Sequence, residues 1–465
     1  MNEQKHTDPL SFVIDFLNKT NEKELATQVV QAFEKYSENT FQYNIIAKLY
    51  HELNDIDKAK YYATKVLNNA NNLQEKVYAR FNLAKIYNDL YEPEKTLPYL
   101  KANDAILDND LSTKLELAKT YILLNDKEKA QETLYNFIKE TDLDSLNEKD
   151  REMVKLNMSS FNFMNGEFQE GLKNFFISIA NLGLWFNHNP LPFPFWQGQE
   201  IQHGTPLVLY LKGGGIGDEF LSVRYIPMLE ILGFSNIIYF TERKNTCDIF
   251  NENGYRAITS IDEIPPSAVW TFALHVPMYL NLKPEEVLLK NYLKPSNKAI
   301  EKWKYLEDGK RPKIGIRWMG AEGNEKNLHR NIKLKDIMDK LSGIDAEFYS
   351  LQINDGTDEL RHYPDIIDLS DNIKSYDDTF AILKNLDYVI TSCTSVLHAS
   401  AIVGTPTYAL IPLISYFTWL SPPTEGRPEN SSIWYDDNLK LYRQTKVNDW
   451  SEPLDKLVED IRISL

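Results

Sequence analysis

Residues 211–229 are LKGGGIGDEFLSVRYIPML, and they place four glycines from Gly213 to Gly217 in a chain that has only 19 glycines among 465 residues. The apolar run LVLYLK at 207–212 precedes them and has the length of a buried strand. The residues that follow, from Asp218 onward, have the spacing of a helix. The stretch therefore predicts a strand, a glycine-rich exit loop and a helix.

This strand, loop and helix favour a ligand site. In parallel sheets, ligands bind beyond the carboxyl ends of strands, where glycine lets the backbone approach closely and a helix N-terminus offers N–H groups to an anion. The spacing matches neither the dinucleotide fingerprint nor a P-loop, so a phosphate or sugar is the expected neighbour. Asp218 is placed to accept a proton from an incoming hydroxyl. The structural alternatives are a tight turn for the glycines and helix capping for Asp218.

Further short apolar runs after residue 206 alternate with helical stretches, which predicts parallel sheets with right-handed crossovers. The segment of roughly 260 residues is too long for one ordinary doubly wound sheet. A polar break at 307–312 divides it into two expected Rossmann-like domains, 207–308 and 309–465. The predicted strands after the first lie at 236–241, 313–318, 347–352, 388–392 and 407–412.

The first 184 residues are expected to be helical and repetitive. The segments 45–59, 82–96 and 116–130 each contain Ala-Lys-x-Tyr, a polar turn and the start of a second helix, at offsets of 37 and 34 residues. A looser fourth copy at 158–172 has Gly166 at the turn. The pattern resembles tetratricopeptide repeats and predicts a concave surface for a protein partner. An aromatic and proline-rich linker, 185–206, is expected to attach the repeats to the remainder, with a sugar-stacking platform as the alternative.

Composition limits the function classes. A formal charge of −16 disfavours nonspecific binding to nucleic acid or anionic lipid. The two cysteines, Cys247 and Cys393, have no spacing typical of a disulfide framework or a zinc site. No signal peptide or membrane span is expected from the sequence. We therefore expect a cytoplasmic protein, in a host cytoplasm if the gene is viral.

Two later stretches also have the composition of anion sites. Residues 310–335 contain eight Lys/Arg and two acids, and Gly320 and Gly323 free backbone amides there, which favours a diphosphate over the alternative of a solvated basic face. In TSCTSVLHASAIVGTP, 391–406, small hydroxyl residues end a predicted strand and His398 lies in the helix that follows. Hydroxyls at a helix N-terminus predict an anion cradle. A packed, structural histidine is the alternative for His398.

Taken in order, PFPFWQGQEIQHGTPLVLYLKGGGIGDEF, FALHVPMYL, IGIRWMGAEGNEKNLHRNIKL, YSLQ, VITSCTSVLHASAIVGTP and SSIWYDDNLKLYRQ resemble bacterial tetratricopeptide proteins that carry a C-terminal heptosyltransferase-like domain of the glycosyltransferase family 9 type. The resemblance covers about residues 190–465, and the repeats extend it toward the N-terminus. It implies an α-helical solenoid followed by an α/β GT-B fold, with two Rossmann-like domains. The first would bind the acceptor and the second the nucleotide sugar, in a metal-independent and inverting reaction.

The resemblance also implies roles for particular residues. Asp218 matches the family's general base, Arg330 an arginine near the donor diphosphate, and Gln352 a residue beside the nucleotide. The family's usual aspartate is replaced by Cys393, and a common arginine by Leu328, which implies an altered donor or lost activity. The expected donor-binding residues are Gly215, Gly217, Trp318, Gly320, Arg330, Gln352, Ser392, Thr394, Ser395 and His398, and the expected acceptor-binding residues are His275 and Arg224.

The function expected from these features is transfer of a sugar from a nucleotide-diphosphate sugar to an acceptor hydroxyl. The acceptor is a glycan, a protein or a hydroxylated base of phage DNA. The donor is a substrate, and no cofactor is expected. The alternative is a catalytically silent repeat scaffold that keeps a nucleotide-sugar-binding-like domain.

Overall fold

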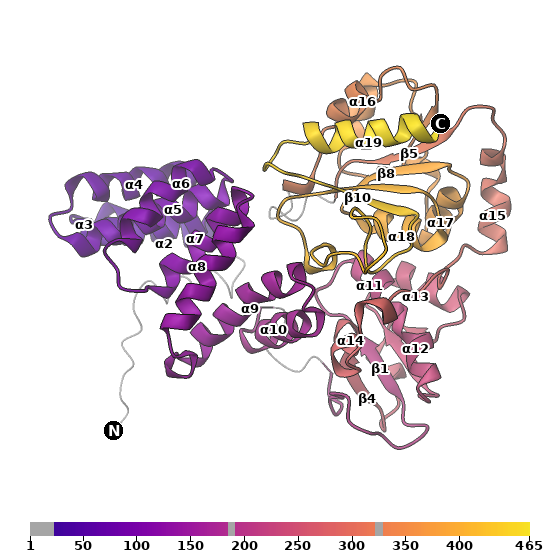
Figure 1. Cartoon of the computed structure of the whole chain (residues 1–465), viewed down its shortest axis with the longest axis horizontal. Coiled ribbons are helices and arrows are strands. Elements are labelled where there is room, and N and C mark those ends of the chain that lie inside the picture. Colours follow the sequence, from indigo (N-terminus) through magenta and orange to yellow (C-terminus); the bar gives the residue numbers. More distant parts are fainter. Residues whose placement is uncertain (1–22, 185–190, 321–328) are drawn as a thin grey trace. The chain divides into compact units, whose positions relative to one another are not determined.

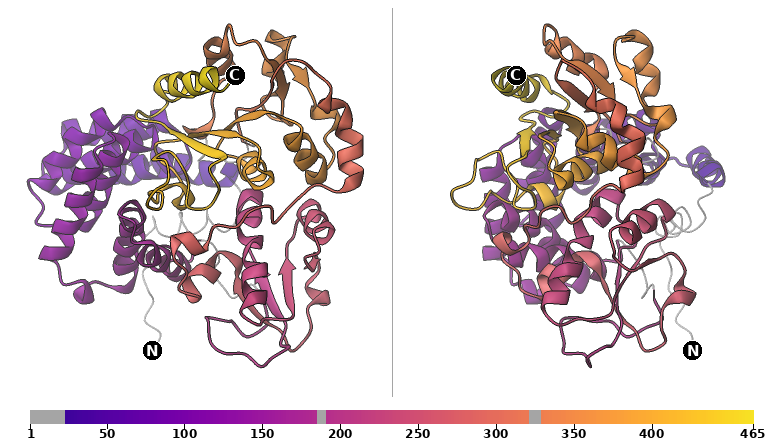
Figure 2. Two further views of the ribbon diagram at one scale, coloured as in Figure 1. Left: turned by 45° about the vertical axis from the view of Figure 1, so that its right-hand side comes forward. Right: turned by 90° about the vertical axis from the view of Figure 1, so that its right-hand side faces the viewer.

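The computed structural model describes residues 23–184, 191–320 and 329–465. Packing divides the chain into two compact units, Met1–Leu146 and Asn147–Leu465. Helix pairs make up the first unit, and the second contains a further helix pair and two parallel sheets with helices on their faces (Figure 1 and Figure 2). This confirms the predicted fold class of helical repeats followed by two Rossmann-like lobes.

The repeats of the first unit share one turn. The second residue after the first helix of each pair is left-handed, with φ of 61° at Asn54, 58° at Tyr91 and 57° at Asn125. The next residue is the N-cap of the second helix, and Asp55 and Asp126 in this position accept hydrogen bonds from backbone N–H groups three residues on. The helices are α2 (Lys23–Lys35), α3 (Thr40–Glu52), α4 (Ile56–Asn69), α5 (Leu73–Asp89), α6 (Pro93–Asp104), α7 (Leu111–Leu123) and α8 (Lys127–Glu140).

A fourth helix pair, α9 (Glu148–Met164) and α10 (Phe168–Asn181), has the same turn, with Gly166 at φ 78°. It packs in the second unit: the Gln169 amide donates to the carbonyl oxygens of Pro277 at 2.9 Å and Leu282 at 2.5 Å. The predicted boundary at 184/185 followed the change in composition. That boundary stays a prediction. The two compact units meet at Leu146, because the fourth pair has an aromatic face that other parts of the second unit cover.

The first lobe has a parallel sheet of order β3-β2-β1-β4. The C-terminal part of the predicted linker, from Leu191 onward, belongs to this lobe. The Trp196 backbone N–H donates to the Trp270 carbonyl at 2.7 Å, and Phe195 forms an isolated parallel β-bridge with Trp270. Residues 185–190 lie outside the described residues. The elements are β1 (Leu207–Tyr210), α11 (Ile216–Val223), α12 (Tyr225–Ile231), β2 (Ile237–Phe240), α13 (Lys244–Glu252), β3 (Ala257–Ile258), β4 (Val269–Phe272) and α14 (Val276–Tyr279).

The second lobe has a parallel sheet of order β10-β9-β8-β5-β6-β7. All six strands predicted from apolar runs are present across the two lobes, whereas β3, β4, β7 and β10 were not predicted. The elements are β5 (Lys313–Arg317), α16 (Leu334–Leu341), β6 (Glu347–Ser350), β7 (Ile367–Asp368), α17 (Tyr376–Lys384), β8 (Tyr388–Ser392), α18 (Ser395–Val403), β9 (Thr407–Ile411), β10 (Leu439–Arg443) and α19 (Ser451–Ser464).

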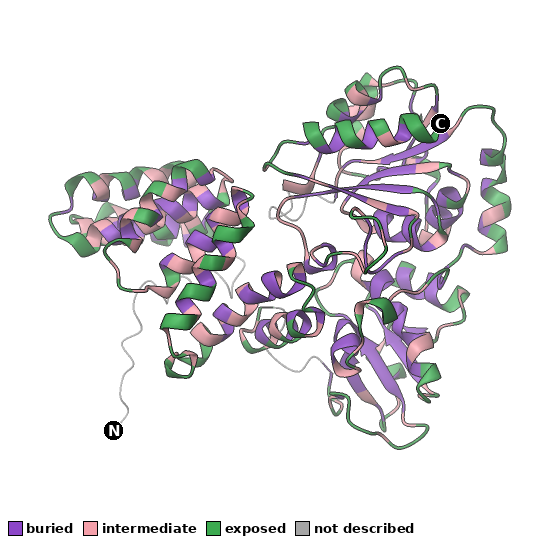
Figure 3. Cartoon of the chain, viewed as in Figure 1, coloured by how far each residue is buried: buried purple, intermediate pink, exposed green. Residues whose placement is uncertain are grey.

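The central strands of both sheets are largely buried on both faces. Every residue of β1, β2 and β9 is buried, as Figure 3 shows for the central strands. Such strands consist of almost continuous apolar residues, because helices cover both faces of a parallel sheet. This burial is the reason that the sequence predicted these strands correctly.

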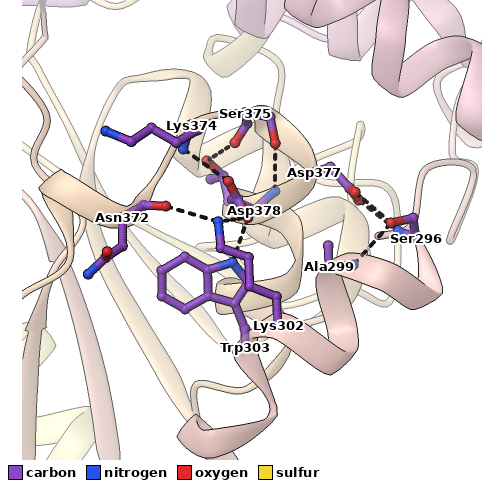
Figure 4. Close-up of polar contacts among 10 residues, drawn as sticks. Ser296, Ala299, Lys302, Trp303, Asn372, Lys374, Ser375, Asp377 and Asp378 are labelled. Carbon is purple, nitrogen blue, oxygen red and sulfur yellow. Dashed lines mark hydrogen bonds and ion pairs between the residues drawn. The ribbon is translucent and has the colours of Figure 1, made fainter.

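The lobes are connected by α15 (Asn297–Trp303), and two aspartates of α17 hold this helix (Figure 4). The Ser296 backbone N–H and hydroxyl donate to Asp377 at 2.7 and 2.6 Å. Lys302 and the Trp303 indole donate to Asp378 at 2.6 and 2.7 Å. The connecting helix is therefore fastened to the second lobe.

Arg224 joins the lobes from the interior. Its side chain is fully buried, and its guanidinium donates to the carbonyl oxygens of Leu221, Val287 and Trp434 and, at 2.8 Å, to the Tyr292 hydroxyl. Because Trp434 belongs to the second lobe, one cation bonds both lobes. Arg224 was expected to bind the acceptor, but no part of it is accessible. Its residue type suggested a ligand, whereas its partners are backbone carbonyls.

We predict that Arg224→Met lowers the free energy of unfolding of the second unit by about 2–4 kcal/mol, because it leaves buried carbonyl oxygens without donors. The measurement is chemical denaturation of the full chain, followed by tryptophan fluorescence. Arg256→Met is the matched control, because Arg256 is exposed and its guanidinium donates to the Asn236 side chain at the surface. Equal effects of the two substitutions would contradict the bridging role.

Candidate functional site

The strand order reverses once in each sheet, and a ligand crevice is expected at each of these points. In the first lobe β1 lies between β2 and β4, and in the second β5 lies between β8 and β6, so successive crossovers leave opposite sides of β1 and of β5. Exit loops diverge at such points and leave room for a ligand at the carboxyl ends of the strands. The segments there are the loop 211–215 after β1, the 3-10 turn 273–275 after β4, and the loops 318–320 after β5 and 393–394 after β8.

The exit loops of β1 and β8 are brought together because the helices that follow them, α11 and α18, pack on each other. Gly217, in the first turn of α11, lies against the His398 ring: a Cβ built on residue 217 would be 2.5 Å from His398 Cδ2 and 2.9 Å from Nε2. Glycine is therefore required here by close approach, and its backbone is not in the left-handed region. The predicted glycine loop and the predicted helix at 395 thus meet across the lobes.

Asp218 lies in the first turn of α11 and is partly buried. Its Oδ2 accepts a hydrogen bond of 2.8 Å from the Gly215 N–H, so the carboxylate caps the helix from its third position. Loss of water around the carboxylate raises its pKa to about 6 and Glu219 adds to this rise, while the Gly215 bond and the charges of Arg243 and Arg330 oppose it. Asp218 therefore caps α11 with its carboxylate and is still partly accessible.

Glu219 and Arg243 brace the glycine loop, and sequence analysis missed both roles. Glu219 is buried and accepts from the Thr241 hydroxyl at 2.6 Å and from Arg243 Nη1 at 3.1 Å. Arg243 Nη2 donates to the Gly214 carbonyl at 2.8 Å. Burial raises the pKa of Glu219, and its ion pair with Arg243 opposes the rise. The only available signal was the position of Arg243, shortly after the predicted strand at 236–241.

Arg330 and the N-terminus of α18 form the opposite wall. Arg330 Nη1 donates to the Cys393 carbonyl at 3.0 Å, and Gly320 accommodates the guanidinium, since a Cβ there would lie 2.7 Å from Nη2. Thr394 is the N-cap of α18, and its side chain makes no capping hydrogen bond. The partial positive charge of this helix end and the charge of the guanidinium therefore lie on the same side of the site, where both would attract an anion. Ser395, also predicted, hydrogen bonds Tyr376.

Three predicted donor-binding residues lie behind this wall. The Gln352 side chain is fully buried; it accepts from the backbone N–H groups of Trp318 and Met319 and donates to the carbonyl oxygens of Met319 and Asp355. The Trp318 indole is buried in the core and donates to Glu359. Ser392 is fully buried. These side chains shape the exit loops of β5 and β8. Because they are buried, their position does not support direct contact with a nucleotide.

Both predicted histidines are buried and neutral. His398 shares a 2.6 Å hydrogen bond between Nδ1 and the Tyr435 hydroxyl, and burial lowers its pKa to about 3. His275 packs on Phe176 and Phe272, and burial likewise lowers its pKa to about 3. Neither supplies positive charge to a phosphate near neutral pH. The packed alternative considered for His398 therefore describes it, and His275 is buried among aromatic rings, where its burial does not support contact with an acceptor.

Cys393 lies beside Arg330 as an uncharged thiol. Its Sγ accepts a hydrogen bond of 3.1 Å from the Trp419 indole, and burial raises the thiol pKa. Both cysteines are free. Gly323 and Leu328, singled out in the basic stretch, lie outside the described residues.

Within the described ranges, no three His, Cys, Asp or Glu side chains are grouped so as to hold a metal ion. None of the helices in the described part of the chain is long and apolar enough to cross a membrane.

Comparison with protein-family models and with curated proteins finds no match. Among solved structures, the chain is similar to ADP-heptose lipopolysaccharide heptosyltransferase II of E. coli, with 12% identity over 56% of this chain and 98% of that one and a TM-score of 0.36. It is also similar to the iron-containing dodecameric glycosyltransferase TibC of enterotoxigenic E. coli, with 12% identity over 57% and 77% and a TM-score of 0.36. A mutant O-GlcNAc transferase of Thermobaculum terrenum matches at 10% identity over 84% and 85%, with a TM-score of 0.31. These values describe a likeness of fold, and the site is interpreted from its own geometry.

The contact between Gly217 and His398 generates a prediction. Gly217→Ala should lower the free energy of unfolding by about 1–3 kcal/mol because the new methyl group overlaps the imidazole, although alanine favours a helix more than glycine does. His398→Ala in the same chain should restore part of that loss. The measurement is the melting temperature of the single and double variants.

Gly215→Ala is the control for stability, because a Cβ at residue 215 meets Asp218 only at an ordinary distance of 3.4 Å. If His398→Ala and Gly217→Ala add independently, the proposed overlap of the two side chains is wrong.

Proposed function

We propose that this protein is a glycosyltransferase that moves a sugar from a nucleotide-diphosphate sugar to an acceptor hydroxyl. One observation carries the proposal: a carboxylate of the first lobe, Asp218, lies near cationic groups of the second lobe that suit an anion. These groups are the Arg330 guanidinium and the N-terminus of α18 at Thr394. A proton acceptor opposite a diphosphate cradle is the arrangement that sugar transfer requires.

The proposed reaction is one in-line displacement. The acceptor oxygen attacks the anomeric carbon, its proton passes to Asp218, and the bond from that carbon to the diphosphate oxygen breaks. Arg330 and the first N–H groups of α18 stabilise the charge on the departing nucleotide diphosphate, in the role that a metal ion has in other transferases. A single displacement inverts the anomeric configuration.

The pKa of Asp218 suits this role. A carboxylate with a pKa near 6 is largely ionised at neutral pH and is a stronger base than an ordinary aspartate. The charge of Arg330 keeps it from rising further. The acceptor side of the site is therefore basic while the donor side is cationic.

The acceptor in this proposal is a glycan or a protein hydroxyl rather than a DNA base, because the chain carries a formal charge of −16. The two free thiols are consistent with a reducing, cytoplasmic setting. A protein partner on the repeats remains part of the proposal. The competing proposal of a silent scaffold is favoured by Cys393, whose neutral thiol stands where related enzymes have a carboxylate.

The first test is release of free nucleotide diphosphate from UDP-, GDP-, dTDP- and ADP-linked sugars. We expect turnover with at least one donor, and Arg330→Gln should lower kcat/KM by about 10²-fold because it removes charge stabilisation. Arg311→Gln is the control, since Arg311 is an exposed surface arginine of the same lobe that pairs with Asp345 and Glu347. A thermal shift with nucleotide sugars but no diphosphate release from any of them would support the scaffold instead.

The second test uses Asp218→Asn, which should lower turnover by about 10²-fold or more. In the wild type, kcat/KM should rise with pH through an apparent pKa near 6, as Asp218 ionises. Asp262→Asn is the control, because Asp262 is an exposed carboxylate of the same lobe. A variant with near-normal turnover would remove Asp218 from the mechanism.

The same substitution should stabilise the fold. Because folding raises the pKa of Asp218, its ionised form costs stability at a pH above about 6, and that cost disappears as pH falls below its unfolded value near 4. Asp218→Asn should therefore unfold with a free energy about 1–2 kcal/mol higher than wild type at pH 8, and the difference should shrink by pH 4.5. Denaturation curves at the two pH values measure it; a gain that is independent of pH would contradict the assignment.

A further inference from the structure

The loop between β9 and β10 is fastened around the proposed site at two points. The Ile414 carbonyl accepts a hydrogen bond of 3.2 Å from His329 Nε2, next to Arg330. The Trp419 indole donates to Cys393 Sγ at 3.1 Å, at the start of α18. The residues between these points, 415–418, are therefore held beside Arg330 and the N-terminus of α18, the proposed donor-binding groups.

Tyr416 lies between the two fastenings. Its ring packs edge-on against Phe417, with centroids 4.6 Å apart, and against Phe175 of α10, at 5.9 Å. The residue is partly exposed, and Asp218 is close enough for its charge, together with burial, to raise the pKa of the phenol. The hydroxyl is therefore uncharged at neutral pH, and the two hydrogen bonds on either side of it hold its loop beside Arg330 and the start of α18.

The Tyr416 hydroxyl differs from those of its buried neighbours. The Tyr435 hydroxyl bonds His398 and the Tyr292 hydroxyl bonds Arg224. No hydrogen-bond partner is present for the Tyr416 hydroxyl among the residues that the structure describes. Its donor and acceptor capacity is thus available to a molecule in the crevice.

Helix α10 holds this tyrosine in place. Phe175 contacts both Tyr416 and Phe417, with ring centroids 5.9 and 5.1 Å apart. Phe176, the next residue, packs on His275 of the first lobe and on Phe417 of the second. The Gln169 side chain fixes the start of the helix to the first lobe. A helix from the repeat-like fourth pair therefore supports the wall on which Tyr416 stands.

We propose that Tyr416 contacts the acceptor by donating its phenolic O–H to an acceptor oxygen beside the attacking hydroxyl, and that Phe175 positions Tyr416. The proposal rests on the proposed function. Asp218 accepts a hydrogen bond and Tyr416 donates one, so together they suit two neighbouring oxygens. The acceptor class is therefore a sugar with adjacent hydroxyl groups, and an isolated serine or threonine hydroxyl satisfies only Asp218.

The experiment compares Tyr416→Phe, Phe175→Leu and the double variant with wild type. The probes are methyl hexosides as acceptors, a serine-containing peptide as the alternative acceptor, and water alone, which reports hydrolysis of the donor. Tyr416→Phe should raise KM for the glycoside about 10-fold, as expected for one lost hydrogen bond. KM for the donor, donor hydrolysis and the melting temperature should stay unchanged.

Phe175→Leu should raise the glycoside KM in the wild-type background but add little to Tyr416→Phe, because it acts through the tyrosine. Phe168→Leu is the matched control: Phe168 is on the same helix and is buried against Phe163 and Trp434. An unchanged glycoside KM for Tyr416→Phe, or transfer to the peptide alone, overturns this inference while diphosphate release still supports the proposed function. A wild type that releases no diphosphate from any donor overturns both.

Discussion

The proposed site depends on one contact between the lobes, in which the backbone at Gly217 lies against the imidazole of His398. Each residue is in a helix whose N-terminus lines a crevice, so this contact sets the separation of the two crevices. Asp218 follows Gly217 directly, and Thr394 precedes His398 by one helical turn. A side chain at residue 217 would push apart the very groups that the proposed displacement needs together.

The same contact has electrostatic consequences. It brings the N-termini of α11 and α18 together, and both ends carry partial positive charge. Desolvation nevertheless dominates at Asp218, whose pKa is raised, because helix ends and arginines compensate only part of the water that the carboxylate loses. A group that costs stability in its ionised state is expected where function, rather than folding, requires it. Arg224, by contrast, is a buried cation whose bonds are all internal.

The sequence predicted element types well and side-chain directions poorly. The six central strands were predicted because burial on both faces gives continuous apolar runs. Strand β7 has only two residues, both exposed, and β10 alternates between buried and half-buried positions, so neither has that pattern. Residue type suggested that His275, Trp318 and Gln352 bind ligands, yet each points into the protein, because orientation depends on packing that no local spacing encodes. Tyr416 went unnoticed for the opposite reason: a single tyrosine in an irregular loop has no pattern.

The fourth helix pair shows how a repeat acquires a second role. Its left-handed turn at Gly166 repeats the turns at Asn54, Tyr91 and Asn125, so its local geometry is that of the other pairs. The fourth pair differs from the others in the composition of its outer face. Four phenylalanines there form an apolar surface that is too large to be left exposed to water. The lobes cover that surface: Phe163, Phe175 and Phe176 pack on Phe417, and Phe168 packs on Trp434. A helix pair that buries its outer face in this way is fixed relative to both lobes, and it is suited to hold a site residue such as Tyr416 in place.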